Sequence, residues 1–426
     1  MRPNSQNAGL NHRLVCAACG ATQGPTARLC FCGGMLEFRY ADANGQWDDR
    51  FGHSMWRYWR LLPVADPYDA VTLNEGATPL LSSALFPDLS LQWKDESRNP
   101  TGSHKDRALA LALTEARRRK ASVSVVVSAG STGLSNAAYA ARAGMMSVSL
   151  MSEGAPDLRV YPLTAYGSHL IEVAAGIDDI IAAACELSGV DGISVASTTR
   201  ASNPFQAEAP KTIAYEIVEQ LGRSPDWLVV PVGGGGTISG IWRGFLDLRQ
   251  RGAIGELPRL AGVVPETYDA LAIALERRIS TEEAFAALPM RDDKPTILNK
   301  LSHAHPPDGL EALAAIRASN GVIVAVSDEA AIDGSMQVAR TDGLYFEPST
   351  GVVVPALVRL RADGALRAGD TVVAIGCGSG QRETFVMQAA RPARRGRAAL
   401  RELPSIIRQI RDNGEATENR YAHRET

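Results

Sequence analysis

The sequence has little of several features that would point to particular classes of protein. Aromatic residues make up only 6% of its 426 residues, and it contains no run of about 18 or more apolar residues, so no membrane-spanning helix is expected. The formal net charge is only −3, which gives no basic surface for nucleic acid. The first residues lack the apolar stretch of a secretory signal peptide. We therefore expect a cytoplasmic protein with neither nucleic-acid nor membrane partners.

What the chain does contain is an alternation of two kinds of segment. Short apolar runs rich in β-branched residues alternate with Ala- and Leu-rich segments of helical spacing. Because the runs are apolar on both faces, they are typical of parallel strands covered by helices. An α/β fold with parallel-rich sheets is predicted. The predicted strands cover 122–128, 145–151, 169–173, 227–232, 259–264, 321–327 and 371–376, and the predicted helices cover 108–120, 137–144, 178–188, 211–222 and 238–250.

The segment KDESRNPTGSHKDRA (94–108) places a lysine at the start of a predicted helix. Pro100 and Gly102 predict a turn, and Lys105 follows it directly. The positive end of a helix disfavours a cation, so a lysine kept neutral there would serve as an amine nucleophile. The alternative is an ordinary surface lysine.

Three small-residue loops each follow a predicted strand: SAGSTG (128–133), PVGGGGT (231–237) and AIGCGSG (374–380). Four consecutive glycines are conformationally costly, and they favour close backbone approach to a phosphate at a helix N-terminus. Neither a P-loop nor the dinucleotide-binding pattern is matched. The first loop is either an anion site or a tight turn. Cys377 in the third is either a ligand contact or a buried structural cysteine.

Taken together and in this order, seven segments resemble the β-family (fold type II) of pyridoxal-phosphate enzymes, and within it the threonine synthases. The resemblance implies a two-lobed, tryptophan synthase β-like α/β fold, with pyridoxal 5'-phosphate as cofactor and a small amino acid as substrate. The segments are LNEGATPLL (73–81), WKDESRNPTGSHKDRA (93–108), SAGSTGLS (128–135), NPFQAEAPKTIAYEIVEQLG (203–222), PVGGGGTISGIWRGF (231–245), FEPSTG (346–351) and GCGSG (376–380).

The resemblance also implies a role for individual residues. Lys105 matches the lysine that holds the cofactor as a Schiff base and moves the substrate α-proton. Cys377 matches the neutral residue beside the pyridine nitrogen, and Ser131 the position beside the ring. The loop that would cradle the cofactor phosphate comprises Gly233, Gly234, Gly235, Gly236 and Thr237, and the residues that would contact the substrate are Ser128, Gly130, Thr132 and Gln206.

A cysteine-bearing segment near the N-terminus, LVCAACG…LCFCGGMLEFRY, resembles one found in many threonine synthases. Four thiolates in such a module could bind a structural zinc ion. The second pair is one residue shorter than the usual spacing, so a ribbon with free thiols is the alternative. The four residues are Cys16, Cys19, Cys30 and Cys32.

Two positions depart from the family pattern. Ser131 stands where the family usually has an asparagine that bonds the cofactor's phenolic oxygen; Ser131 itself or Asn136 could supply that contact. Gln206 stands where many threonine synthases have an arginine that grips the substrate phosphate, and a phosphate without a paired cation is poorly held. Arg98 or Arg200 would then have to supply the charge.

Three functional hypotheses follow from this pattern. The first is a threonine synthase-like lyase that converts O-phosphohomoserine and water to threonine and phosphate. The second is a β-eliminating or β-replacing enzyme acting on serine, threonine, phosphoserine or a related amino acid, which Gln206, Ser131 and Cys377 favour. The third is a relative that binds the cofactor without turnover.

We expect the chain to divide into four parts. A zinc-ribbon-like module (13–40) precedes a large cofactor-binding lobe (41–108 plus 206–390). A small mobile lobe (109–205) would close over the substrate, and a basic, helical tail (391–426) would present a solvated face. A homodimer is the default assembly for such a fold.

Overall fold

The computed structural model describes residues 11–24, 27, 30–41, 46–154, 157–187, 190–196, 199–200, 203–288, 295–384, 386, 405 and 407–408. The chain divides into two units, Met1–Phe385 and Val386–Thr426. The sheets and the candidate site lie in the first unit. The predicted basic tail lies almost wholly outside the described residues. None of the described helices is long and apolar enough to cross a membrane.

A six-stranded sheet, called the large sheet below, has the order β12-β11-β10-β13-β5-β4. All neighbouring pairs are parallel except β4 with β5 at one edge, which confirms the predicted parallel-rich α/β fold. Its strands are β4 (Leu80–Ser82), β5 (Ser90–Lys94), β10 (Trp227–Pro231), β11 (Arg259–Pro265), β12 (Val322–Val326) and β13 (Thr371–Ile375).

Alternate residues of the large sheet face two separate hydrophobic cores, because successive side chains of a strand point to opposite faces. Leu228 and Val230 of β10 pack with α5 (Lys211–Leu221), α6 (Gly236–Gln250) and α9 (Gly309–Ala318). Trp227 and Val229 pack with α10 (Asp328–Asp342) and α12 (Val353–Ala362). Helices on both faces explain why these strands are continuously apolar in sequence.

A four-stranded parallel sheet, called the small sheet, has the order β8-β7-β6-β9. Its strands are β6 (Val123–Val127), β7 (Met146–Ser152), β8 (His169–Val173) and the short β9 (Ile193–Val195). Its helices are α2 (Ser131–Ala143), α3 (Asp157–Ala165) and α4 (Ile177–Glu186). Helix α1 (Lys105–Arg118) packs on α2, and residues Leu109–Leu113 share a core with Val126 of β6. Because α1 begins at Lys105, this packing connects the lysine segment to the small sheet.

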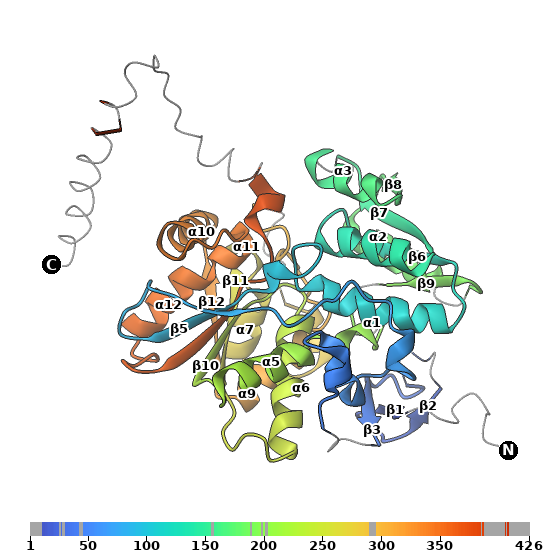
Figure 1. Cartoon of the computed structure of the whole chain (residues 1–426), viewed down its shortest axis with the longest axis horizontal. Helices are drawn as coiled ribbons and strands as arrows, with labels where there is room; N and C mark the ends of the chain where they lie inside the picture. The colour runs from blue at the N-terminus through green and yellow to red at the C-terminus, as the bar shows by residue number, and fades with distance from the viewer. Residues whose placement is uncertain are drawn as a thin grey trace. The chain divides into compact units, whose positions relative to one another are not determined.

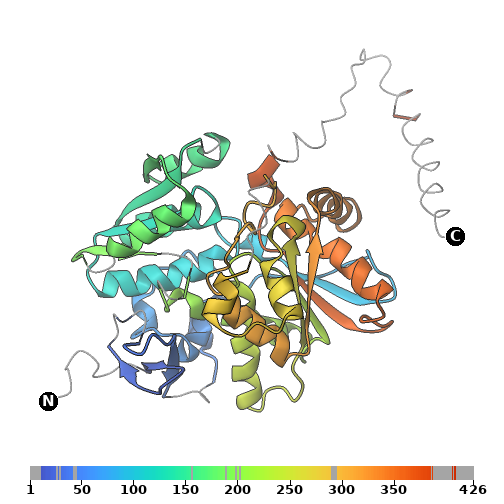
Figure 2. The same ribbon diagram turned by 180° about the vertical axis from the view of Figure 1, so that it is seen from behind.

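The N-terminal residues form a three-stranded antiparallel sheet of order β2-β1-β3. The strands are β1 (His12–Cys16), β2 (Thr22–Gln23) and β3 (Leu36–Tyr40), so the strand predicted at LEFRY is confirmed. Figures 1 and 2 show this sheet on one side of α1 and the small sheet on the other. Phe38 of β3 packs against Phe205, with ring centroids 5.0 Å apart and the ring planes tilted by 60°. This contact connects the N-terminal sheet to the segment that carries Gln206.

The segment 46–72, for which the sequence predicts no element, forms three 3-10 helices: η2 (Asp49–Phe51), η3 (Met55–Leu61) and η4 (Pro67–Asp69). Met55 and Trp56 of η3 are buried against α1. The remaining helices are α7 (Ala270–Glu276), α8 (Glu282–Ala286) and α11 (Pro348–Gly351), and the remaining 3-10 turns are η5 (Glu96–Arg98), η7 (Gln206–Glu208), η8 (Glu266–Tyr268) and η9 (Gly380–Glu383).

A buried ionic network fixes α1 to the large sheet. Arg107, two residues after Lys105, is fully buried and bonds both Glu96 and Glu216 at 2.6–2.8 Å. Lys94 at the end of β5 bonds the same Glu216 at 2.7 Å. Two cations therefore balance two buried carboxylates, as such burial requires.

Candidate active site

Lys105 is the first residue of α1, and its segment is held against the loop that follows β13. The His104 amide donates to the Cys377 carbonyl at 3.1 Å, and Ser103 forms an antiparallel bridge with Gly378. The Lys105 side chain is half-buried. Burial lowers the pKa of its ammonium group below the usual value. The neutral amine needed for covalent catalysis is therefore favoured at the predicted position.

The glycine loop leads into α6, with Gly235 at φ 93° as the N-cap residue. A Cβ at Gly233 or Gly235 would lie 2.6 Å from the carbonyl oxygen of Lys300 or Asp308, respectively. A side chain at either position would therefore clash with the protein's own backbone. Packing requires these two glycines whether or not the loop binds a phosphate. A Cβ at Gly234 would make only an ordinary 3.4 Å contact with Pro307. The first N–H groups of a helix have no partner within the helix and are suited to bind a phosphate, so the α6 N-terminus could hold one.

His104 connects the glycine loop to the Cys377 loop, a role that the sequence analysis missed. Its Nε2 lies 3.3 Å from Thr237 Oγ1, and its Nδ1 lies 3.1 Å from the Cys377 carbonyl oxygen. Burial, with a further contribution from the charge of Lys105, lowers the pKa of His104 to about 3. The neutral ring therefore links two predicted cofactor-binding residues, Thr237 and Cys377, and the third, Lys105, follows His104 in the chain. The only signal in the sequence was its place beside Lys105.

Cys377 is buried, and burial followed by the charge of Glu347 raises the pKa of its thiol well above the usual value. The thiol is therefore neutral. Its backbone amide donates to Thr350 Oγ1 at 3.1 Å, and the Glu347 amide donates to the Gly378 carbonyl at 3.1 Å. The FEPSTG segment thus supports the Cys377 loop, although no residue of that segment was singled out as a site residue from sequence.

The loop between β6 and α2 turns tightly around Ser128. Its hydroxyl accepts from the Gly130 amide at 3.0 Å, and a Cβ at Gly133 would lie 2.2 Å from the Ser128 carbonyl oxygen. Ser131 and Thr132 begin α2 and are both buried. Ser131 Oγ accepts a hydrogen bond from Arg382 at 3.3 Å. This contact joins the small-sheet loop to the segment after Cys377.

Asn136 does not take the place of the asparagine that is missing at position 131. Its side chain is fully buried and bonds Ser124 Oγ at 2.6 Å and Ser147 Oγ at 3.0 Å. Both partners belong to strands of the small sheet. One helical turn separates Asn136 from Ser131, and that turn directs its amide into the sheet. The alternative assigned to Asn136 from sequence is therefore wrong.

Gln206 lies in η7, which packs against both α1 and α6. Only 3% of the residue is exposed, yet its side-chain Nε2 and Oε1 have no hydrogen-bond partner. The two arginines considered as substitutes for a cation here are both paired with acids. Arg98 bonds Asp95 at 3.0 Å with 63% of its side chain exposed, and Arg200 bonds Glu311 at 2.9 Å.

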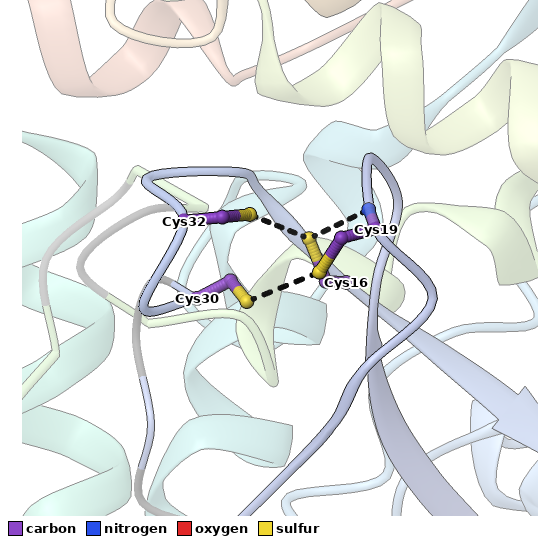
Figure 3. Close-up of side chains that lie close together, drawn as sticks. All are labelled: Cys16, Cys19, Cys30 and Cys32. Carbon is purple, nitrogen blue, oxygen red and sulfur yellow. Dashed lines mark hydrogen bonds between the residues drawn. The ribbon is translucent and has the colours of Figure 1, made fainter.

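The four N-terminal cysteines converge at one end of their sheet (Figure 3). Their sulfur atoms all lie within 4.8 Å of one another, with Cys16 to Cys32 and Cys19 to Cys30 each at 3.6 Å. A zinc ion with four Zn–S bonds of about 2.3 Å has sulfur–sulfur edges of about 3.8 Å. The arrangement therefore has the dimensions of a zinc site with four cysteine ligands. All six cysteines of the chain are free of disulfides.

The side chains gathered around Lys105 fit pyridoxal phosphate. A lysine with a lowered pKa stands near a glycine loop at a helix N-terminus and near a neutral thiol. The loop offers donors for a phosphate, and the lysine is suited to a covalent bond with an aldehyde carbon. The thiol can face a ring nitrogen without protonating it.

Comparisons with known proteins agree with this geometry. The chain is similar to threonine synthase of Methanocaldococcus jannaschii, with 32% identity covering 86% of this chain and 92% of that protein. It is 30% identical to threonine synthase of Mycobacterium tuberculosis, covering 81% and 89% respectively. Among solved structures, the L-serine ammonia-lyase of Rhizomucor miehei has a TM-score of 0.61 at 20% identity, covering 74% of this chain and 97% of that one.

O-ureido-L-serine synthase has a similar fold, with a TM-score of 0.60 and 21% identity over 75% of this chain and 94% of that one. These structural similarities support the fold type II architecture but leave the substrate open. The family described as "Pyridoxal-phosphate dependent enzyme" matches residues 71–378, a range that contains Lys105, the glycine loop and Cys377. The chain is therefore a threonine synthase-like member of the pyridoxal-phosphate-dependent enzyme family.

Proposed function

We propose that the protein is a threonine synthase-like lyase that converts O-phosphohomoserine and water to threonine and phosphate. The observation that carries the proposal is the similarity to two threonine synthases over more than four-fifths of this chain and of each relative. The lowered pKa of Lys105 and the glycine loop at the α6 N-terminus support the same proposal, because both are needed for the cofactor of that reaction.

The chain's own residues have separable tasks in this proposal. The backbone amides of the loop that leads into α6, from Gly233 to Thr237, would hold the cofactor phosphate, and the neutral Cys377 thiol would lie beside the ring nitrogen. When bound, pyridoxal phosphate stabilises negative charge that develops at the substrate α-carbon. Lys105 Nζ, because its pKa is lowered, is available to accept the α-proton and to return it. The Ser128–Thr132 loop binds the substrate carboxylate.

One observation favours the second hypothesis, an elimination or replacement enzyme acting on serine, threonine, phosphoserine or a related amino acid. Gln206 is neutral, and both polar atoms of its buried amide lack a partner. A buried amide in that state is costly, so a ligand group that both donates and accepts, such as a hydroxyl or carboxamide, would stabilise it. A phosphate, which mainly accepts, would satisfy only half of it.

Phosphate release from O-phosphohomoserine tests the first proposal, with threonine followed in the same reaction. Equal amounts of phosphate and threonine would support it, and loss of both in Lys105→Ala would assign the chemistry to the site. No release from O-phosphohomoserine, together with a 2-oxo acid formed from serine or threonine, would replace it with the second hypothesis. No turnover of any of these substrates would favour the non-catalytic relative.

We further propose that Cys16, Cys19, Cys30 and Cys32 hold one structural zinc ion, on the strength of the sulfur geometry. Metal analysis of purified protein should give about one zinc per chain, and Cys32→Ser should lower this content. Cys185→Ser, a change outside the cluster, should leave it unchanged. Metal-free folded protein with four reactive thiols in this cluster would contradict the proposal. The homodimer, the cytoplasmic location and the four-part division of the chain remain predictions of the sequence.

A further inference from the structure

The side chain of Arg382 extends between the two halves of the candidate site. Arg382 lies in η9, five residues after Cys377. A Cβ built at Gly102 would lie 3.0 Å from Arg382 Cδ, so the alkyl stem lies against the turn just before Lys105. The guanidinium then reaches across the site to Ser131 Oγ at 3.3 Å, where α2 begins. One cation therefore contacts both the lysine segment and the small-sheet loop.

The other cations near the site are already neutralised by carboxylates. Lys300 pairs with Glu347 and with Glu383, the latter at 2.9 Å. Arg159 also pairs with Glu383 at 2.9 Å, and Arg98 and Arg200 have the acidic partners described above. The charge of each of these cations is therefore already offset by a carboxylate.

Arg382, by contrast, forms no ion pair within 4.0 Å among the residues that the structure describes. Its charge acts on Asp106, but both oxygens of that carboxylate accept hydrogen bonds from Thr101 at 2.6 Å. A guanidinium has five N–H donors, and Ser131 uses one of them. Two neighbouring N–H groups of the guanidinium therefore remain available to bind both oxygens of an oxyanion.

We propose that Arg382 determines substrate specificity by binding the distal phosphate of a phosphorylated amino acid in the active site, beside Ser131. The inference rests on the proposed function. Arg382 would supply the positive charge that is missing at position 206, where Gln206 stands in place of an arginine. A phosphate dianion needs a paired cation when it leaves water, whereas the substrate's carboxylate can be held by the neutral donors of the Ser128–Thr132 loop. Arg382 is the described cation that combines this position with unpaired donors.

The test uses the holoenzyme and two amino acids that differ only in a phosphate group, L-serine and O-phospho-L-serine. Binding of each is followed by the change in visible absorbance of the bound cofactor. In Arg382→Gln, the dissociation constant for O-phospho-L-serine should rise about 10- to 100-fold, as expected for loss of charge-assisted hydrogen bonds. The constant for L-serine should change less than about threefold. Arg382→Lys, which keeps the charge but not the planar fork, should recover part of the loss.

Two controls separate this inference from its alternatives. Arg98→Gln removes an exposed, paired arginine and should change neither constant. The cofactor absorbance of each variant before titration reports that the folded site is intact. Equal weakening of both ligands in Arg382→Gln would overturn the inference, since the cation would then serve the shared carboxylate. Unchanged binding of both, or wild-type protein that does not prefer the phosphorylated ligand, would also overturn it.

The same experiment remains informative if the proposed function fails. Absence of threonine formation from O-phosphohomoserine, together with selective loss of O-phospho-L-serine binding in Arg382→Gln, would remove the threonine synthase proposal and leave the phosphate site standing. Threonine formation that persists unchanged in Arg382→Gln, with an unchanged KM for O-phosphohomoserine, would support the threonine synthase proposal and remove the phosphate site at Arg382.

Discussion

The large and small sheets follow the same alternation of strand and helix, yet they are buried to very different extents. Every residue of β10 and β13 in the large sheet is buried. No residue of β8 in the small sheet is buried, and α3 buries only Leu163. Local stability follows buried apolar contact. The glycine loop and the Cys377 loop, which we propose hold the cofactor, therefore follow the more deeply buried strands, and the Ser128–Thr132 loop, which we propose contacts the substrate, follows a strand of the more lightly packed sheet.

Lys105 belongs to both regions, so its removal gives the largest expected effect. Lys105→Ala should lower turnover by at least about a thousandfold, because covalent attachment and proton transfer depend on one amine. The measurement is kcat, together with the visible absorbance of the loaded protein. Lys120→Ala changes an exposed lysine just beyond the end of the same helix and should leave both unchanged. Turnover that survives Lys105→Ala would remove the lysine from the chemistry.

The ionic network around Arg107 gives the next largest effect, since it anchors α1 to the large sheet. Arg107→Met should lower the free energy of unfolding by about 3–5 kcal/mol, because it leaves Glu96 buried without its cation and leaves Glu216 with Lys94 alone. Urea unfolding measures this change, with Arg117→Met on the exposed end of α1 as the control. A loss below about 1 kcal/mol would mean that the network does not hold the helix.

The pH dependence of stability sharpens the same test. Burial by itself would raise the pKa of Glu216, but the charges of Arg107 and Lys94 outweigh it and lower that pKa from 4.5 to about 2. A depressed carboxyl pKa stabilises the folded state above the unfolded pKa. Wild-type stability should therefore fall as the pH drops from about 4.5 towards 2. Arg107→Met should fall less steeply over that range in urea unfolding measured at successive pH values.

Most strands of the large sheet, and the loops that come together around Lys105, could be predicted from the sequence. Strands buried on both faces are continuous apolar runs, and the loops after them are small-residue segments with few alternatives. The 46–72 segment could not be predicted, because 3-10 turns lack the hydrophobic period of a helix. The Arg382–Ser131 contact joins residues 251 positions apart, and no local pattern records such a pairing.

The side-chain direction of Asn136 was mispredicted for a related reason. The sequence placed Asn136 on the helical turn after Ser131, which suggested that it could reach the cofactor. The packing of α2 on β6 and β7 shows instead that the Asn136 amide faces the strands. Ser124 and Ser147, its partners, lie in apolar-looking strands where a short polar side chain gives little signal. Sequence spacing therefore predicted which helix carries Asn136 but not which face of the helix it occupies.

A smaller effect is expected inside the small sheet. Asn136→Ala leaves Ser124 and Ser147 without their buried partner and should cost about 1–3 kcal/mol of unfolding free energy. The kcat should change less than about twofold, since the amide does not reach the site. Ser131→Ala on the same helix should show the opposite pattern, with weaker substrate binding and little loss of stability. A large fall in kcat for Asn136→Ala would reinstate it as a cofactor contact.

Arg98 gives the smallest expected effect and decides whether an exposed charge near the site matters. Its ion pair with Asp95 leaves 63% of the side chain in solvent, where such pairs contribute less than about 1 kcal/mol. Arg98→Gln should therefore leave stability, kcat and the KM for O-phosphohomoserine within about twofold of wild type. Steady-state kinetics at low and high salt measure this, because an exposed charge that guides an anionic substrate would lose its influence as salt increases. A salt-dependent rise in KM specific to Arg98→Gln would place the substrate phosphate near η5 instead of beside Ser131.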